Sequence, residues 1–123
     1  YTINGAQLKK IFAHIMRTEN RNSEGECYQV NSQVRAVYND SSGELESLKV
    51  NGKDVKDNTN YKIAMQRYHF KSAKEYLGTS MEELLASGGD KTVATSAQQV
   101  LEEYLRNNQN IKKEVEGRLV YKN

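Results

Sequence analysis

This chain of 123 residues carries 18 basic and 16 acidic side chains, for a net charge of +2, and 37% of its residues are hydrophobic. The length suits one domain with its own hydrophobic core, and the near balance of charge gives no sign of polyanion binding. No apolar run approaches the roughly 20 residues of a membrane-spanning helix, and the single Cys27 excludes an internal disulfide framework.

The N-terminal part has the pattern of a strand followed by an amphipathic helix. Residues 1–3 are strand-like, and Asn4 is a good N-cap for the helix after it. The apolar residues that follow keep the i, i+3, i+4 spacing of one helix face, which predicts that they form core: Leu8, Ile11, Phe12, Ile15 and Met16. The polar residues 18–26 are predicted to be a loop.

Alternating apolar residues and turn clusters predict strands in the middle of the chain. These strands cover residues 27–30, 34–38, 45–50 and 61–65. The turn cluster at residues 39–43 makes 34–38 and 45–50 a hairpin, and Asn51-Gly52 is a second tight turn.

The C-terminal half changes to helical patterns. One helix ends at Gly78, a second opens with a capping box at Ser80, and a third begins at Thr95 or Ser96. On the third helix, the residues predicted to face the core are Ala97, Val100, Leu101, Tyr104 and Leu105. A short helix over 111–115 and a strand over 118–121 complete the pattern. The whole predicts one α+β domain over residues 1–123, with a mixed sheet of about five strands packed with four to five helices.

The residues that usually carry catalysis are scarce. A pair of divalent metal ions needs several histidine and carboxylate ligands, and the only histidines are His14 and His69. We therefore assign no catalytic residue and no metal ligand in this chain. A Cys27 nucleophile beside either histidine stays open, although a buried thiol is the commoner role for such a cysteine.

The most informative stretch runs from Leu45 to Met65 and contains Val50-Asn51-Gly52-Lys53 and Tyr61-Lys62-Ile63-Ala64. Together with Gly5-Ala6-Gln7-Leu8 and Ser87-Gly88-Gly89-Asp90, it resembles the C-terminal domain of the 5'-nucleotidase and 2',3'-cyclic-nucleotide phosphodiesterase family. That family has a Gly-Ala-x-Leu helix start, a strand pair, a following aromatic residue and a Ser-Gly-Gly-Asp loop. The resemblance covers nearly the whole chain, in the same order.

The resemblance implies a substrate-binding role for a small set of residues. Tyr68 falls where the family places an aromatic ring that stacks on the nucleobase, and Phe70 is a near alternative. Gly88 and Gly89 would let a ligand approach the backbone, and Asp90 would accept hydrogen bonds from the base or ribose. The plainer alternatives are that Phe70 belongs to the core and that the two glycines end a helix.

The resemblance also implies partners and a location. Catalysis in the family belongs to an N-terminal metallophosphoesterase domain with Asp-x-His and Gly-Asn-His motifs, neither of which occurs in this chain. This chain would then bind a nucleotide or nucleoside, hold no cofactor itself and be inactive alone, with the divalent metals in the catalytic domain. The expected location is extracellular, cell-envelope or periplasmic.

One departure from the family pattern supports a rival interpretation. Residues 71–87 separate the aromatic position from Gly88-Gly89 and are predicted to be a helical insertion that forms a lid, a specificity wall or a partner surface. The rival function is a protein-interaction or structural module whose ligand site has decayed. Nucleic-acid binding through the basic and aromatic residues 67–74 is unlikely, because the net charge is low.

Overall fold

The computed structural model describes residues 1–22 and 28–123 and contains six helices and six strands within them. The helices are α1 (Gly5–Ile15), α2 (Thr18–Asn22), α3 (Arg67–Lys71), α4 (Ala73–Tyr76), α5 (Met81–Leu85) and α6 (Ala97–Asn107). The strands are β1 (Thr2–Asn4), β2 (Val34–Asn39), β3 (Glu44–Val50), β4 (Lys53–Asp54), β5 (Asn60–Lys62) and β6 (Leu119–Lys122). This content confirms the predicted α+β class.

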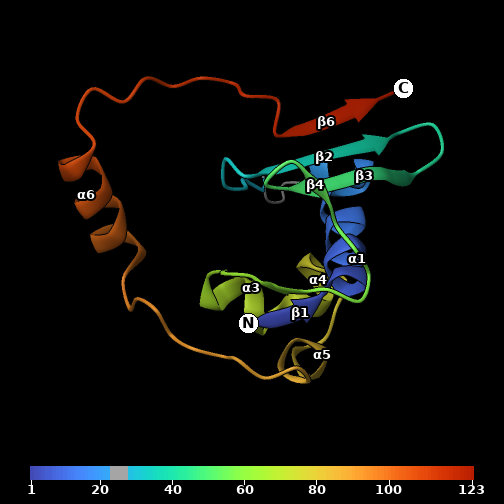
Figure 1. The fold of residues 1–123 in the computed structure, drawn as a ribbon, viewed down its shortest axis with the longest axis horizontal. Helices are drawn as coiled ribbons and strands as arrows, with labels where there is room; N and C mark the ends of the chain where they lie inside the picture. The colour runs from blue at the N-terminus through green and yellow to red at the C-terminus, as the bar shows by residue number, and fades with distance from the viewer. Residues whose placement is uncertain (23–27) are drawn as a thin grey trace.

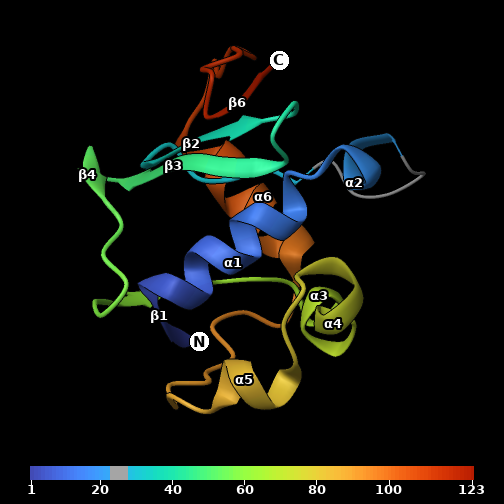
Figure 2. The same ribbon diagram turned by 90° about the vertical axis from the view of Figure 1, so that its right-hand side faces the viewer.

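The strands form two sheets rather than one. The larger sheet has the order β4-β3-β2-β6, and it is mixed because β2 runs antiparallel to β3 and parallel to β6. The smaller sheet pairs β1 with β5, with Thr2 opposite Lys62. Figure 1 and Figure 2 show α1 beneath the larger sheet, with β1 and helices α3 to α5 on the other side of α1. The helix therefore separates the two sheets.

Helix α1 is the centre of the core, as the sequence predicts. Its start is fixed by a capping box, in which the Asn4 side chain accepts the Gln7 N–H at 2.8 Å and the Gln7 side chain accepts the Asn4 N–H at 3.1 Å. The predicted apolar face is buried, with Leu8, Ile11, Phe12 and Ile15 between 5% and 7% exposed. It shares one core with the buried Ala36, Tyr38 and Leu48 of the larger sheet.

Gly5 is required by the close contact between α1 and the segment after β4. A Cβ atom at Gly5 would lie only 2.1 Å from the Lys56 carbonyl oxygen. The next residue, Ala6, donates its N–H to the Asp57 carbonyl at 3.2 Å. The glycine of the Gly-Ala-x-Leu pattern thus lets the backbone of the helix start approach the backbone of another loop.

The segment between α1 and β2 differs from the prediction in two places. Residues 18–22 form helix α2 instead of a loop, held by an Arg21–Asp40 ion pair and an Asn20 side-chain bond to the Ile15 carbonyl at 2.9 Å. The predicted strand over 27–30 was wrong for residues 28–30, which lie in neither helix nor strand. Strand β6 already pairs with the edge of β2 that such a strand could have used. Residues 23–27, including Cys27, lie outside the described part.

The insertion between Tyr68 and Gly88 is part of the core, which corrects the expectation of a lid. It contains α4 and α5, joined at Gly78, and it buries Ala73, Leu77 and Leu84 to 5% exposure or less. Gly78 has a φ of +65°, and a Cβ there would lie 2.5 Å from the His14 ring. The insertion therefore packs tightly against α1 rather than standing over it.

Helix α6 forms where the sequence predicts, but the structure does not bury its predicted inward face. Ser96 caps it by accepting the Gln99 N–H at 3.2 Å. Yet the apolar face is exposed to water, with Val100, Leu101 and Tyr104 at 51%, 56% and 56%. Helical periodicity shows which face is apolar, not what that face contacts. The short helix predicted over 111–115 is also absent, since residues 111–117 are in neither helix nor strand.

Candidate functional site

The first candidate ring, Tyr68, lies on α3, the helix that follows the segment after β5. Its side chain is exposed, with the residue at 53%. Its hydroxyl lies 2.8 Å from the Tyr76 hydroxyl, and the centroids of the two rings are 5.4 Å apart. The His69 ring meets Tyr68 edge-on at 5.7 Å. Tyr68 therefore belongs to an aromatic cluster that keeps it in place but leaves much of it open to solvent.

The second candidate ring, Phe70, stacks on Tyr1. The two ring centroids are 4.9 Å apart and the planes differ by only 13°. This offset stack is favourable in itself and fixes the orientation of both rings. Because the two rings are in contact, there is no room for a third ring between them. Tyr1 is a neighbour of the candidate ring that the sequence reasoning missed.

Gly88 and Gly89 contact Thr2, the first residue of β1. The Gly88 carbonyl accepts the Thr2 N–H at 3.4 Å, and a Cβ at Gly89 would lie 2.6 Å from the Thr2 hydroxyl. Both glycines have positive φ, +71° and +76°. The Gly88 N–H also donates to the Leu85 carbonyl at 2.9 Å, which is a helix-ending contact. The glycines thus end the α5 region and at the same time allow close backbone contact.

The structure brings most of the predicted site residues to the start of β1. Tyr1 contacts Phe70, and the neighbouring Thr2 contacts Gly88 and Gly89. Asp90 follows directly and is exposed. Tyr68 lies instead with Tyr76. Neither Tyr68 nor Asp90 lines either of the two best-formed cavities in the described part of the chain.

A signal for Tyr1 was present in the sequence. Residues 1–3 and 61–65 were both predicted as strands, and antiparallel pairing of the two places the first residue beside the end of the second strand. In the structure the Tyr1 backbone nitrogen donates to the Ile63 carbonyl at 3.0 Å, and the Ile63 N–H donates to the Tyr1 carbonyl at 2.9 Å. This pairing carries Tyr1 to α3 and so to Phe70.

Electrostatic contacts fix the helix that leads into the glycine loop. The Ser80 N–H, the Thr79 hydroxyl and the nearby Lys10 hold the pKa of Glu83 below its usual range. The Thr79 hydroxyl, on a residue only 4% exposed, donates to Glu83 at 2.8 Å. These contacts complete the predicted capping box and anchor α5 to α1, so that Gly88 leaves α5 in a defined direction.

The residues described do not suit a metal site. Among residues 1–22 and 28–123, no three His, Cys, Asp or Glu side chains are grouped closely enough to hold a metal ion. His14 faces the Glu75 carbonyl at 2.8 Å, and His69 lies within the aromatic cluster, 5.6 Å from the Tyr28 ring. A pairing of either histidine with Cys27 falls outside the described residues.

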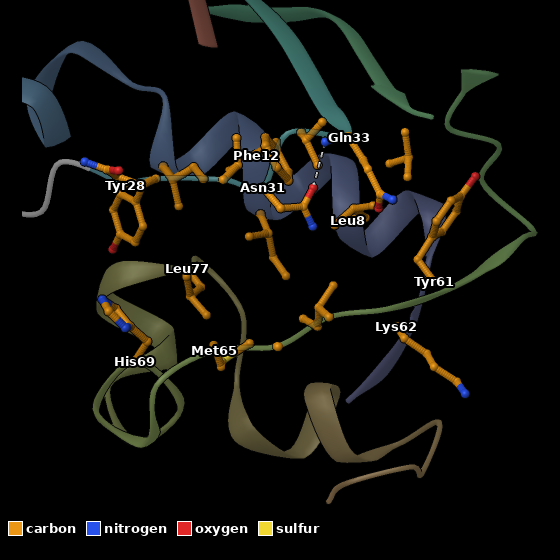
Figure 3. A pocket seen from close by; sticks show the side chains of 18 of the residues that line it. Leu8, Phe12, Tyr28, Asn31, Gln33, Tyr61, Lys62, Met65, His69 and Leu77 are labelled. Atoms are coloured by element: carbon orange, nitrogen blue, oxygen red, sulfur yellow. Dashed lines mark hydrogen bonds between the residues drawn. The ribbon is translucent and has the colours of Figure 1, made fainter. Parts of the chain in front are cut away.

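A mainly apolar groove of about 670 Å³ lies beside α1. Figure 3 shows Leu8 and Phe12 of α1 on one side of it and Met65 and Leu77 on the other. The Asn31 side chain crosses its rim to accept the Gln33 N–H at 3.1 Å. Tyr28 and His69 of the aromatic cluster line it, but none of the candidate residues of the site does. This groove is therefore a feature separate from the surface at the start of β1.

Comparison with known protein families matches residues 1–82, two thirds of the chain, to the 5'-nucleotidase C-terminal domain. The chain therefore belongs to the family of 5'-nucleotidase C-terminal domains, a nucleotide-related class. The matched range contains Tyr68 and Phe70 and ends before Gly88. No curated protein and no solved structure matches the chain. A search of the described residues finds no helix with the length and apolar character needed to cross a membrane.

Proposed function

We propose that this chain is the nucleotide-recognition domain of a metal-dependent 5'-nucleotidase-type hydrolase, and that it stacks the nucleobase without being catalytic itself. The observation that supports this is the set of aromatic rings in and beside the family-matched segment. Phe70 is oriented by Tyr1, Tyr68 is exposed on the same helix, and Gly88-Gly89 contact Thr2 next to them.

The chemistry of these groups suits a base more than any other part of a nucleotide. An aromatic face stacks on a base with about 1–3 kcal/mol and accepts every base, because all have a π-face. The Asp90 carboxylate adds an acceptor for base or ribose donors, and the left-handed glycines allow close approach to the backbone. We assign the phosphate contacts to the catalytic partner.

The partner implied by the family is an N-terminal metallophosphoesterase domain that holds the divalent metals and hydrolyses the phosphate ester. The present domain would deliver the nucleotide to it by domain closure. We also propose, on family grounds, an extracellular, cell-envelope or periplasmic location.

We expect adenosine to bind the chain weakly, with a Kd of about 1 mM or more, because a stack supplies only part of the ~4 kcal/mol that this affinity needs. Titration followed by amide chemical shifts should perturb residues 68–70 and 88–90. Tyr68→Ala and Phe70→Ala should each weaken binding several-fold. Tyr121→Ala removes a ring on β6 that is 36% exposed and lies outside the candidate site, and it should leave the titration unchanged. Shift changes that survive both site substitutions would refute the assignment.

We expect no hydrolysis of AMP, cyclic nucleotides or a generic phosphate ester by the chain alone, with or without added divalent metal. The reason is that its described residues offer no grouped ligand set. A phosphate-release assay over a series of metals checks this, with a metallophosphatase as positive control. Turnover that co-purifies with the chain and is lost in His14→Ala or His69→Ala would show that catalytic groups do reside here.

A further inference from the structure

Helix α6 presents an apolar face that is largely exposed to water. Its four large apolar side chains are each about half exposed: Val100, Leu101, Tyr104 and Leu105. At 100° per residue they fall on one side of the helix, with Gln99 and Arg106 opposite. Figure 1 shows α6, drawn in orange, held away from the rest of the molecule on two long connections.

A helix of this length is not expected to persist without a packing partner. α6 has 11 residues, all of them exposed. Isolated helices shorter than about 12–15 residues are marginal in water, and most helices in proteins gain their stability from burying an amphipathic face. The Ser96 cap and the Gln98–Glu102 side-chain bond at 2.9 Å contribute only a little. The apolar face of α6 therefore needs a complementary surface.

The apolar groove beside α1 is such a surface. Its floor is the buried stripe of α1, and its lining includes apolar side chains that are still partly in water: Val34, Val50, Ile63 and Met65. Polar side chains such as Asn31 and Gln33 lie beside them. Amphipathic helices commonly bind by laying an apolar face into a groove with apolar walls. Its volume of about 670 Å³ is large enough for several apolar side chains.

The position of α6 and the length of its connections allow it to reach the groove. In Figure 1 it stands opposite the space between the larger sheet and α3, and in Figure 2 it lies behind α1 at the same level. Residues 86–96 and 108–118 connect it to the body, eleven on each side. Eleven extended residues span up to about 36 Å, whereas a compact domain of this size has a radius of gyration of about 14 Å.

We propose that α6 folds back onto its own chain and buries its apolar face in the groove beside α1. A second copy of the chain could offer the same helix. However, a short flexible connection gives an effective concentration in the millimolar range, so the helix of the same chain prevails at micromolar protein. This inference does not rest on the proposed function, because the groove is separate from the residues at the start of β1.

The direct test is methyl NOE spectroscopy on the unsubstituted chain. We expect contacts from the methyl groups of Leu101 and Leu105 to those of Val34, Val50 or Ile63. A sample that mixes two differently labelled chains should show these contacts within chains only. Contacts seen only between chains would identify a second copy as the occupant and overturn the proposal. The absence of any contact would overturn it too.

Stability of matched double variants gives an independent measurement. Leu101→Ser with Leu105→Ser should lower the thermal midpoint by about 5 °C or more, because burial of both side chains is lost. Gln99→Ser with Arg106→Ser, on the opposite face of the same helix, should change it much less. Equal shifts for the two pairs would mean that no face of α6 is buried and would refute the docking.

Discussion

Replacing Phe12 with alanine is expected to lower the free energy of unfolding by about 3–5 kcal/mol. Phe12 is 7% exposed and lies on the α1 face that packs against the larger sheet. Truncation removes a large apolar surface and leaves a cavity that a close-packed core fills only in part. Domains of this size have a total stability of only about 5–15 kcal/mol, so this variant loses a large share of it.

Chemical denaturation of Phe12→Ala beside the unsubstituted chain measures this loss. Lys10→Ala is the matched control on the same helix, because its ion pair with Glu83, at 3.5 Å, is exposed and contributes little to stability. Similar unfolding midpoints for Phe12→Ala and Lys10→Ala would show that α1 is peripheral to the core.

Leu84→Ala is expected to lower the free energy of unfolding by about 2–5 kcal/mol. Leu84 lies in α5, two residues beyond the range that matches the family, yet it is 1% exposed. A lid that opens freely would tolerate the change, whereas a segment that completes the core would not. The expected size of the effect therefore tests whether the insertion is integral to the domain.

The neighbouring Leu85 offers the control for this substitution. It has the same side chain in the same helix but is 41% exposed. Leu85→Ala should change stability by less than about 1 kcal/mol in the same denaturation experiment, because little surface is transferred from water. An effect of Leu84→Ala no larger than that of Leu85→Ala would show that this segment is a mobile lid and not part of the core.

Local sequence signals predicted the elements that depend on neighbours in the chain. The capping boxes at Asn4 and Ser80 form, and Asn51 and Gly52 adopt the left-handed conformation of a tight turn, with φ of +53° and +75°. The apolar stripe of α1 is buried. Each of these features is decided within three or four residues, so the pattern alone specifies it.

Features that depend on distant partners were not predictable in the same way. Whether residues 28–30 form a strand depends on which segment pairs with the free edge of β2. That segment is β6, which lies some 85 residues after β2 in the chain. The burial of Leu77 and Leu84 depends on how α4 and α5 return to α1. In α6, the periodicity identified the apolar face but not its exposure.

In the candidate site, too, local sequence predicted some features, and others depend on contacts between distant residues. The family pattern identified Tyr68, Phe70 and the two glycines by their order in the chain. It could not show that Phe70 stacks on Tyr1, because that contact follows from the pairing of β1 with β5 and the path into α3. Phe70 and the two glycines lie at one edge, and Tyr68 lies in a neighbouring cluster with Tyr76.

The most direct test of the nucleotide-recognition role is a transferred NOE measurement with adenosine in excess over the chain. Base stacking predicts cross-peaks from adenine H2 and H8 to the ring protons of Phe70, Tyr1 or Tyr68, and their loss in Phe70→Ala and Tyr68→Ala. Ribose 5-phosphate, which lacks the base, should give no such contacts. Adenine cross-peaks only to side chains of the groove, such as Phe12 or Ile63, or no cross-peaks at all, would contradict the account.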